Sequence, residues 1–288
     1  MTLQEALSLG TKRLEQEHIE EAAIDAWFLL EFVTGMKRSV YYLDPDRQLL
    51  PEQINQYKTH IETRATHVPL QHITGVQEFM GLVFEVNENV LIPRQDTELL
   101  VETVLESMKE YDKADPFVLD MCTGSGCVII SILANRNAYG TGVDISKEAL
   151  EVAKRNASHN QVNLTLVESN LFEKVTGGFD MIVSNPPYIK TKQIEMLQAE
   201  VKLHDPFLAL DGKEDGLFFY RHIIEESILY LHTKGQLFFE IGHDQGEEVA
   251  ALMEAAGFTE INIKKDLAGL DRVVWGRYSQ RTRRNSNV

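Results

Sequence analysis

The sequence is poor in cysteine, in long apolar runs and in basic side chains. Two cysteines, Cys122 and Cys127, are too few for a disulfide framework, and no Cys/His spacing is typical of a zinc site. No apolar run approaches the ~20 residues that a membrane span needs, and residues 1–5 lack the basic-then-apolar order of a signal peptide. We therefore expect a reduced, cytoplasmic protein without a metal or a membrane partner.

Basic side chains are outnumbered by acidic ones, 28 to 44, which gives a formal net charge of −16. Sequence-independent binding of nucleic acid needs clustered Lys and Arg that neutralise phosphates, so we expect no direct nucleic-acid binding. An acidic surface suits a basic partner, although solubility alone explains this charge equally well. The 288 residues, 43% of them apolar, suit a small domain followed by a catalytic one.

Residues 1–74 are expected to form a helical domain. One apolar helix is predicted at Ala22–Val33 and ends at Gly35, and another begins at Pro51, a residue suited to a first helical turn, and runs to about Thr66. This region contains no cluster of catalytic residue types. It is either a helical cap or a module that docks a macromolecular substrate.

A hairpin linker is expected at residues 75–94. Its predicted first strand is Phe79–Val86, its turn is Asn87–Asn89, and its returning strand is Val90–Ile92. A helix from about Thr97 to Tyr111 should follow.

Residues 95–279 alternate between strand and helix patterns, which predicts a doubly wound α/β domain with a mostly parallel seven-stranded sheet. The polar tail, residues 280–288, is expected to be disordered. The expected strands are Phe117–Met121, Tyr139–Val143, Leu164–Glu168, Phe179–Ser184, Gln236–Ile241, Thr259–Lys264 and Arg272–Arg277. The expected helices are Val128–Asn135, Lys147–His159, Gly216–His232 and Gln245–Ala256.

A glycine-rich loop, residues 122–126, follows the first of these strands and precedes a helix. Asp144 ends the next strand, where a carboxylate can accept hydrogen bonds from both ribose hydroxyls. A dinucleotide fingerprint needs a third glycine at position 129, which is Ile129, and Asp120 before the loop would repel a pyrophosphate. S-adenosylmethionine, which carries an ammonium and a sulfonium, fits better than NAD. A purely structural turn is the alternative.

Asn170 follows the third strand, where this fold class often places an acceptor for the adenine amino group. Its spacing is equally consistent with a loop cap. Leu171 and Phe172 could pack on the adenine or belong to the core.

The run from Asn185 to Tyr188, Asn-Pro-Pro-Tyr, leaves the carboxyl end of a buried strand, the edge at which open α/β sheets bind ligands. The side-chain oxygen of Asn185 and the carbonyl of Pro186 provide two fixed acceptors, which match the two N–H bonds of a planar NH₂ group, and Tyr188 can cover its flat face. Holding both hydrogens aligns a poorly nucleophilic nitrogen and stabilises its developing positive charge, so no strong general base is needed. The alternative is a rigid proline turn.

Several segments between about residue 70 and residue 277 together resemble one family, the peptide-chain release factor N(5)-glutamine methyltransferases of the PrmC/HemK group. The helical region also resembles that family's substrate-docking domain. The matching segments are residues 93–98 (PRQDTE), 119–126 (LDMCTGSG), 183–189 (VSNPPYI), 208–212 (LALDG), 239–242 (FEIG) and 266–272 (DLAGLDR).

The resemblance implies a Rossmann-like class I methyltransferase that acts on the glutamine of the Gly-Gly-Gln motif in class 1 release factors. It implies that S-adenosylmethionine is held by Cys122, Thr123, Gly124, Ser125, Gly126, Asp144, Asn170, Leu171 and Asn185. It implies that the glutamine is held by Asn185, Pro186, Pro187 and Tyr188, with Asn185, Pro186 and Tyr188 catalytic.

Two residues depart from the family pattern. Cys122 stands where a glycine is expected, and Leu171 stands where a tryptophan is frequent, so aromatic stacking on the adenine is either missing or supplied by Phe172.

Two other functions fit parts of the pattern. The first is methylation of an exocyclic amino group of adenine or guanine in RNA or DNA, which uses the same pair of acceptors but conflicts with the charge of −16. The second is a non-catalytic protein, either a scaffold that binds the cofactor or an RNA-binding adaptor, and the intact Asn-Pro-Pro-Tyr run disfavours it. Glu240 could support the site or cap the core. Arg94 could orient the loop above the active site through a carboxylate such as Asp96 or Glu98, or it could simply form an ion pair at the start of the helix.

Overall fold

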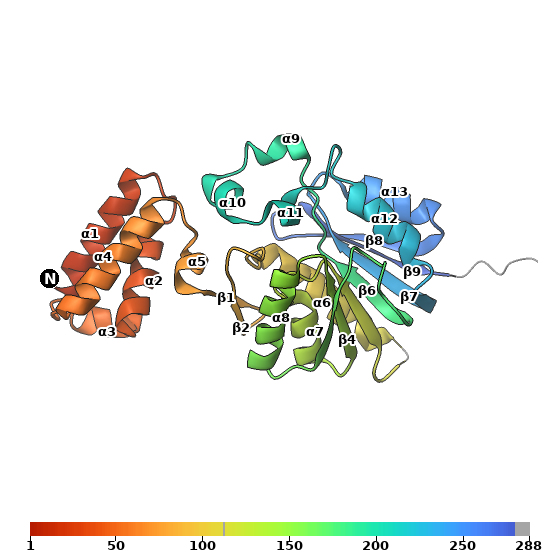
Figure 1. Ribbon diagram of the computed structural model, residues 1–288, viewed down its shortest axis with the longest axis horizontal. Helices are drawn as coiled ribbons and strands as arrows, with labels where there is room; N and C mark the ends of the chain where they lie inside the picture. The colour runs from red at the N-terminus through yellow and green to blue at the C-terminus, as the bar shows by residue number, and fades with distance from the viewer. Residues whose placement is uncertain (112, 280–288) are drawn as a thin grey trace, which may run out of the picture. The chain divides into compact units, whose positions relative to one another are not determined.

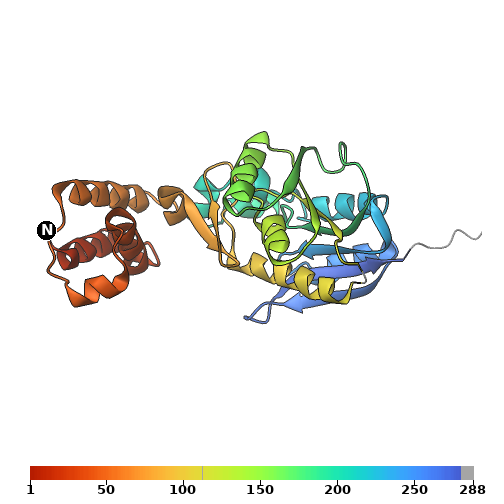
Figure 2. The ribbon, with the colours of Figure 1, turned by 90° about the horizontal axis from the view of Figure 1, so that it is seen from below.

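The structure is a computed structural model that describes residues 1–111 and 113–279 (Figures 1 and 2), so the expectation for the tail at 280–288 lies outside the described residues. The chain forms two compact units. The first comprises Met1–Val76 and Gln198–His204, and the second comprises Gln77–Leu197 and the chain from Asp205 onward. The sequence patterns did not predict that residues 198–204 would belong with the N-terminal helices.

The first unit is helical. Thr2 begins its first helix, because its side chain accepts a hydrogen bond from the backbone nitrogen of Glu5, while Gly35 ends the second with a φ of 65°. The aromatic rings of Trp27 and Tyr57 lie in its core. Its helices are α1 (Leu3–Gln16), α2 (Ala22–Thr34), α3 (Arg38–Leu43), α4 (Pro51–Ala65), α5 (Leu70–Thr74) and α10 (Ala199–His204).

A buried ion-pair network crosses this unit. Arg64 on α4 donates from Nε to the Asp25 carboxylate on α2 at 2.7 Å, and the side chains are only 5% and 7% exposed. The same guanidinium donates from a terminal nitrogen to Glu200 on α10. Arg64 therefore ties the distant segment 198–204 to the N-terminal helices.

The second unit begins with a hairpin formed by β1 (Val76–Phe79) and β2 (Leu82–Glu85). The predicted turn at Asn87–Asn89 is present, and the Val90 nitrogen donates to the Asn87 carbonyl at 3.2 Å, but this turn does not close the hairpin. The hairpin instead reverses at Met80 and Gly81, which have φ values of 52° and 72°. Two consecutive positive φ values are typical of the tight turns that match strand twist. The predicted return strand at Val90–Ile92 is irregular, and the side chains of Val90 and Ile92 are buried instead.

A seven-stranded sheet follows, in the order β5-β4-β3-β6-β7-β9-β8. Its pairs are parallel except for β9, which runs antiparallel to both β7 and β8. The predicted fold class is confirmed. The strands are β3 (Phe117–Met121), β4 (Tyr139–Asp144), β5 (Leu164–Glu168), β6 (Phe179–Ser184), β7 (Leu231–Glu240), β8 (Phe258–Lys265) and β9 (Asp271–Tyr278).

Helices cover both faces of this sheet (Figure 1). One apolar cluster joins the sheet to α6 and α7, and a second joins it to α12 and α13. The helices of this unit are α6 (Gln95–Glu110), α7 (Cys127–Asn135), α8 (Lys147–His159), α9 (Thr191–Ile194), α11 (Phe207–Leu210), α12 (Phe218–Ser227) and α13 (Gly246–Ala255).

The predicted helix at Gly216–His232 is too long. The helix α12 ends at Ser227, whose carbonyl accepts a hydrogen bond from the Tyr230 nitrogen in a closing turn. The chain then enters the sheet at Leu231, which pairs with Phe179, so β7 starts earlier than predicted. Sheet pairing, a tertiary interaction, overrides the continuing apolar pattern here. Within the described residues, no helix is long and apolar enough to cross a membrane.

Candidate active site

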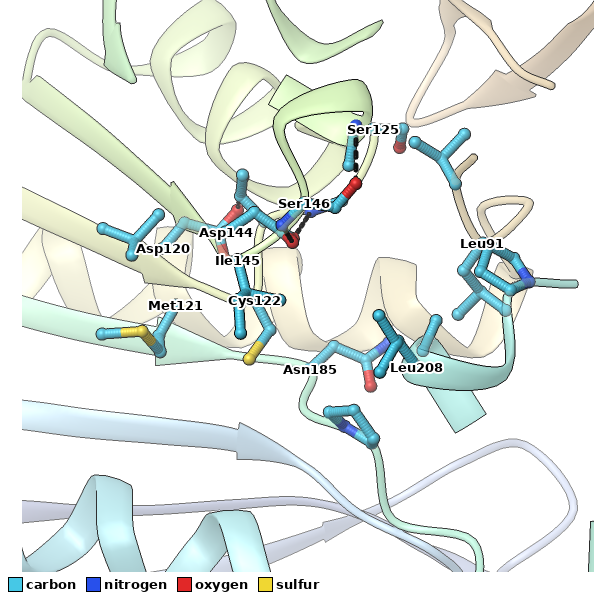
Figure 3. A pocket seen from close by; sticks show the side chains of 18 of the residues that line it. Leu91, Asp120, Met121, Cys122, Ser125, Asp144, Ile145, Ser146, Asn185 and Leu208 are labelled. Carbon is cyan, nitrogen blue, oxygen red and sulfur yellow. Dashed lines mark hydrogen bonds between the residues drawn. The ribbon is translucent and has the colours of Figure 1, made fainter. Parts of the chain in front are cut away.

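A cavity of about 510 Å³ opens at the carboxyl ends of β3, β4 and β6. The strand order changes direction between β3 and β6, and ligands of open α/β sheets bind at such a switch point. Figure 3 shows Cys122 after β3, between Asp144 at the end of β4 and Asn185 after β6. The topology thus brings together three segments that lie 22 to 63 residues apart in sequence to form one wall.

Most of the residues predicted from the sequence line this cavity. Gly126, Pro186 and Tyr188 lie outside its lining. Residues before α6 and around α11 complete the wall, among them Leu91 and Leu208. The predicted residues in the lining are Cys122, Thr123, Gly124, Ser125, Asp144, Asn170, Leu171, Asn185 and Pro187.

Asp144 connects the end of β4 to the glycine loop. Its carboxylate accepts hydrogen bonds from the backbone nitrogens of Gly124 at 2.8 Å and Ser146 at 2.9 Å. Burial raises the pKa of Asp144, and these backbone donors oppose the shift. The remaining lone pairs can accept hydrogen bonds from a ligand, so the position suits the recognition of a ribose.

The glycine loop is shaped by a buried carboxyl and by one glycine. Asp120 is 1% exposed, accepts a hydrogen bond from the Thr123 hydroxyl at 2.6 Å, and lines the cavity. Burial raises the pKa of Asp120 to about 7. Gly126, with a φ of 79°, precedes α7, and a Cβ there would come within 2.9 Å of the Ile130 side chain. Gly126 therefore supports close packing of loop and helix.

The two residues that depart from the family pattern share an unusual backbone conformation. Cys122 has a φ of 63° and Leu171 has a φ of 47°, and both line the cavity. Residues other than glycine rarely adopt positive φ values, and backbone strain of this kind is concentrated at binding sites. Burial raises the pKa of the Cys122 thiol, so that thiol stays protonated.

In the segment after β5, the structure shows which side chains line the cavity and which belong to the core, a question that the sequence left open. Asn170 lines the cavity while its amide nitrogen donates to Glu173 Oε1 at 2.8 Å. Phe172 is 1% exposed and stacks on Tyr230 with ring centroids 4.8 Å apart. Phe172 is therefore a core residue, and Leu171 is the apolar side chain that this segment contributes to the cavity.

Asn185 contacts Thr97, which the sequence did not identify as part of the site, and Glu240, for which the sequence left a supporting role open. The Nδ2 atom of Asn185 lies 3.3 Å from the hydroxyl oxygen of Thr97 on α6. Glu240, the last residue of β7, is 3% exposed, and burial raises its pKa to about 7, against hydrogen bonding from Thr97 and Asn185. The sequence segments PRQDTE and FEIG contain two of these residues, but no spacing pattern indicates that they meet.

Tyr188 and the loop after Asn185 are anchored in the core. The carbonyl oxygen of Tyr188 accepts a hydrogen bond from Gln245 Nε2 at 3.1 Å, and its ring packs against the apolar cluster under α12 and α13. Burial raises the pKa of the Tyr188 phenol. Gln245 was not identified from the sequence as a residue of the site, because it is distant in the chain.

Arg94 pairs with neither of the carboxylates expected from the sequence. Its guanidinium donates to Asp205 Oδ2 at 2.8 Å, and Asp96 instead pairs with Arg272 at 3.1 Å. Arg94 also lines the cavity. The expectation of a local ion pair at the start of α6 was wrong because the chain brings Asp205 close by tertiary folding.

The parallel sheet, the glycine loop with its acidic partner on the next strand, and Asn-Pro-Pro-Tyr after β6 define a Rossmann-like class I methyltransferase. Residues 5–75 match the model of the PrmC N-terminal domain, and residues 95–213 match that of the methyltransferase small domain. A release factor glutamine methyltransferase from Caulobacter vibrioides is 41% identical, with 96% of each chain covered. One from Geobacter sulfurreducens is 39% identical, again with 96% of each chain covered. The chain belongs to the release factor glutamine methyltransferase family.

Solved structures of lower identity share the fold. The structure of a methyltransferase from Pyrococcus furiosus has a TM-score of 0.50 and 17% identity, and covers 69% of this chain and 90% of its own. A T. thermophilus 16S rRNA N2 G1207 methyltransferase, in complex with AdoMet and guanosine, has a TM-score of 0.52 and 16% identity. It covers 70% of this chain and 49% of its own, and the likeness concerns the fold alone.

Proposed function

We propose that the protein transfers a methyl group from S-adenosylmethionine to the side-chain amide nitrogen of the glutamine in the Gly-Gly-Gln motif of class 1 release factors. The single observation that carries this proposal is that Asn185 opens into the same cavity as Asp144 and the glycine loop. Family membership, at about 40% identity over nearly the full chain, supports the release factor as substrate.

The residues of the cavity fit S-adenosylmethionine. The volume of about 510 Å³ lies within the roughly 300–1,000 Å³ typical of small-molecule sites. Asp144 offers acceptors for the ribose hydroxyls, Leu171 offers an apolar surface for the adenine, and the buried carboxyl of Asp120 suits the ammonium. When bound, S-adenosylmethionine supplies a methyl group that is activated by its positively charged sulfur.

The protein's own groups orient the nitrogen that accepts this methyl group. In this proposal Asn185, which lines the cavity, accepts one hydrogen of the glutamine NH₂ through Oδ1. The carbonyl of Pro186, which follows Asn185 but is not among the lining residues, accepts the other. Both hydrogen bonds strengthen as positive charge grows on the nitrogen, which lowers the barrier. With S-adenosylmethionine held by Asp144 and the glycine loop, the nitrogen oriented by Asn185 would receive the methyl group that the sulfonium supplies, and it would then release its extra proton to solvent.

The helical unit is proposed to bind the release factor. It contributes no residue to the lining of the cavity, and it matches the PrmC N-terminal domain. Methylation of an amino group in RNA or DNA is the competing function, and the net charge of −16 disfavours it.

The experiment is incubation of the purified protein with methyl-labelled S-adenosylmethionine and one of two acceptors, a release factor or total RNA. We expect label in the release factor, located by mass spectrometry to a single glutamine in the Gly-Gly-Gln peptide. An Asn185→Ala variant serves as the inactive control. Label in RNA but not in the release factor would support the competing function.

A further inference from the structure

Glu240 is placed next to Asn185 by the register of the sheet. Ser184 on β6 pairs with Phe239 on β7, so the following residues, Asn185 and Glu240, emerge side by side at the cavity edge. Thr97 on α6 is 2% exposed and adjoins both side chains. A carboxyl, a hydroxyl and a carboxamide therefore form a buried cluster directly behind the proposed substrate site.

The chemistry of these three groups sets the direction of every hydrogen bond among them. An ionised carboxylate can only accept, so the Thr97 hydroxyl and the Asn185 NH₂ group, whose hydrogen bonding opposes the raised pKa of Glu240, must both donate toward it. The Thr97 oxygen is then left as an acceptor, and it lies 3.3 Å from Asn185 Nδ2, which donates to it. The NH₂ group of Asn185 is thereby turned into the protein.

We propose that Glu240 is a positioning residue: together with Thr97 it fixes the Asn185 carboxamide so that Oδ1, and not the NH₂ group, faces the cavity. This inference rests on the proposed function of Asn185. A carboxamide locked in this orientation presents an acceptor, so it selects a substrate group that donates hydrogens. The amide nitrogen of glutamine donates hydrogens and its amide oxygen does not, and the lock therefore favours methylation at nitrogen.

A role in core stability explains Glu240 poorly. A buried carboxylate costs free energy unless it is fully paired, and Oε2 of Glu240 has no hydrogen-bond partner within residues 1–111 and 113–279. Arg272 faces it, but that guanidinium also pairs with Asp96 and Asp266. A glutamine of the same shape would avoid this cost, so the acid is better explained by its strict acceptor character.

The orientation of the Asn185 carboxamide should depend on pH. A protonated Glu240 can donate as well as accept, so it no longer sets the direction of the hydrogen bonds among Glu240, Thr97 and Asn185. Burial raises the pKa of Glu240 to about 7. Since ionised Glu240 is the active form, kcat should fall as pH decreases through about 7. Five other titratable groups within the described residues influence Glu240. They are Asp96 on α6, Cys127 on α7, Tyr188 after β6, Tyr220 on α12 and Arg272 on β9.

The first test compares Glu240→Gln with wild type at saturating cofactor, with Glu248→Gln on the exposed face of α13 as the matched control. We expect kcat for the release factor to fall roughly 10- to 100-fold, the effect that losing an orienting partner has at metal sites. The KM for the release factor should stay within about twofold, because its contact surface is unchanged. The decline of kcat below pH 7 should vanish in Glu240→Gln and persist in the control.

The second test is a double-variant cycle. Asn185→Asp keeps an acceptor toward the cavity but sets two carboxylates side by side, so its kcat should be low. Adding Glu240→Gln removes one of these charges and supplies a hydrogen-bond donor to the carboxylate introduced at position 185. The double variant should therefore have a kcat at least tenfold higher than that of Asn185→Asp alone. If the two substitutions acted independently, the double variant would instead be slower than Asn185→Asp. Thr97→Val removes the hydroxyl that links Glu240 to Asn185 but keeps the shape of the side chain. Its kcat should therefore fall as much as that of Glu240→Gln.

Cofactor affinity, measured by calorimetry, and the unfolding midpoint verify that each variant is folded. The proposal is overturned if Glu240→Gln keeps the wild-type kcat and pH profile, or if the double variant is no faster than Asn185→Asp. If wild type itself leaves the release factor unmethylated, the proposed function fails instead.

Discussion

The carboxylate of Asp144 accepts a hydrogen bond from the backbone nitrogen of Gly124 at 2.8 Å, which joins the end of β4 to the loop after β3. Its other oxygen accepts from the Ser146 nitrogen at 2.9 Å. The side chain thus shapes the cavity wall and also offers lone pairs to a ligand. A substitution there should act on both the loop and the cofactor.

Asp144→Ala should weaken the binding of S-adenosylmethionine by ~1.5–3 kcal/mol, or roughly 10- to 150-fold, because charge-assisted hydrogen bonds to the ribose are lost. Asp144→Asn, which keeps one acceptor oxygen, should lose less. Calorimetry on both variants measures the dissociation constants. An affinity for Asp144→Ala equal to that of wild type would exclude Asp144 as the ribose ligand.

Asn185→Ala should lower the single-turnover rate on release factor by on the order of 10²–10³, by analogy with the loss of one oxyanion-hole donor. The affinity for release factor should barely change, since a wide surface holds the protein partner. Asn185→Asp should lie between Ala and wild type, because it retains an acceptor but adds charge beside Glu240. Equal rates for all three proteins would contradict a role of Asn185 in orienting the nitrogen.

Cys122 provides a test of backbone strain at the cavity. Its φ of 63° suits glycine, and a residue with a Cβ adopts it at a cost of roughly 1–2 kcal/mol. Cys122→Gly should therefore be more stable than Cys122→Ala by about 1 kcal/mol, since both variants remove the thiol and only Ala keeps the strain. Urea unfolding without cofactor measures this difference. A more stable Ala variant would mean that the loop relaxes out of this conformation.

Arg64→Ala should destabilise the helical unit by about 3–5 kcal/mol, because Asp25 would remain buried without its partner. The double variant Asp25→Leu/Arg64→Met, which replaces the pair with apolar side chains, should recover most of this loss. Urea unfolding followed by Trp27 fluorescence reports on this unit. If the double variant is as unstable as Arg64→Ala, the remaining carboxylate is not the source of the instability.

A fragment that starts at Thr74 should keep its affinity for S-adenosylmethionine but methylate intact release factor poorly. All residues that line the cavity follow this point, whereas the proposed docking helices precede it. Calorimetry with the cofactor verifies that the fragment is folded, and a short Gly-Gly-Gln peptide serves as the control substrate. Turnover of release factor at the full-length rate would contradict the docking role.

The sequence by itself determined the fold class and the position of the glycine loop between a strand and a helix. The strands Phe117–Met121, Leu164–Glu168 and Phe179–Ser184 were predicted with their observed bounds, because each is a short run of strand-forming residues between clear breaks. The helix at Lys147–His159 was predicted equally well, since Ser146 caps it and its apolar residues recur on one face. Local chemistry is sufficient at these positions.

The clustering of the candidate residues could be predicted where it depends on the end of a strand. The glycine loop, Asp144 and Asn185 line one cavity, as expected, because the carboxyl ends of parallel strands meet at one edge. Local patterns failed where the chain turns without a typical turn sequence, as at Met80, and where sheet pairing begins early, as at Leu231.

Only the tertiary structure decided which side chains stand behind the site. Thr97, Glu240 and Asn185 come from a helix, a strand end and a loop that are separated by 55 residues or more, and no spacing in the sequence relates them. The same holds for the pairing of Arg94 with Asp205 and of Arg64 with Glu200. Periodicity reports which face of an element is buried, but the partner on that face is chosen by the register and packing of the folded chain.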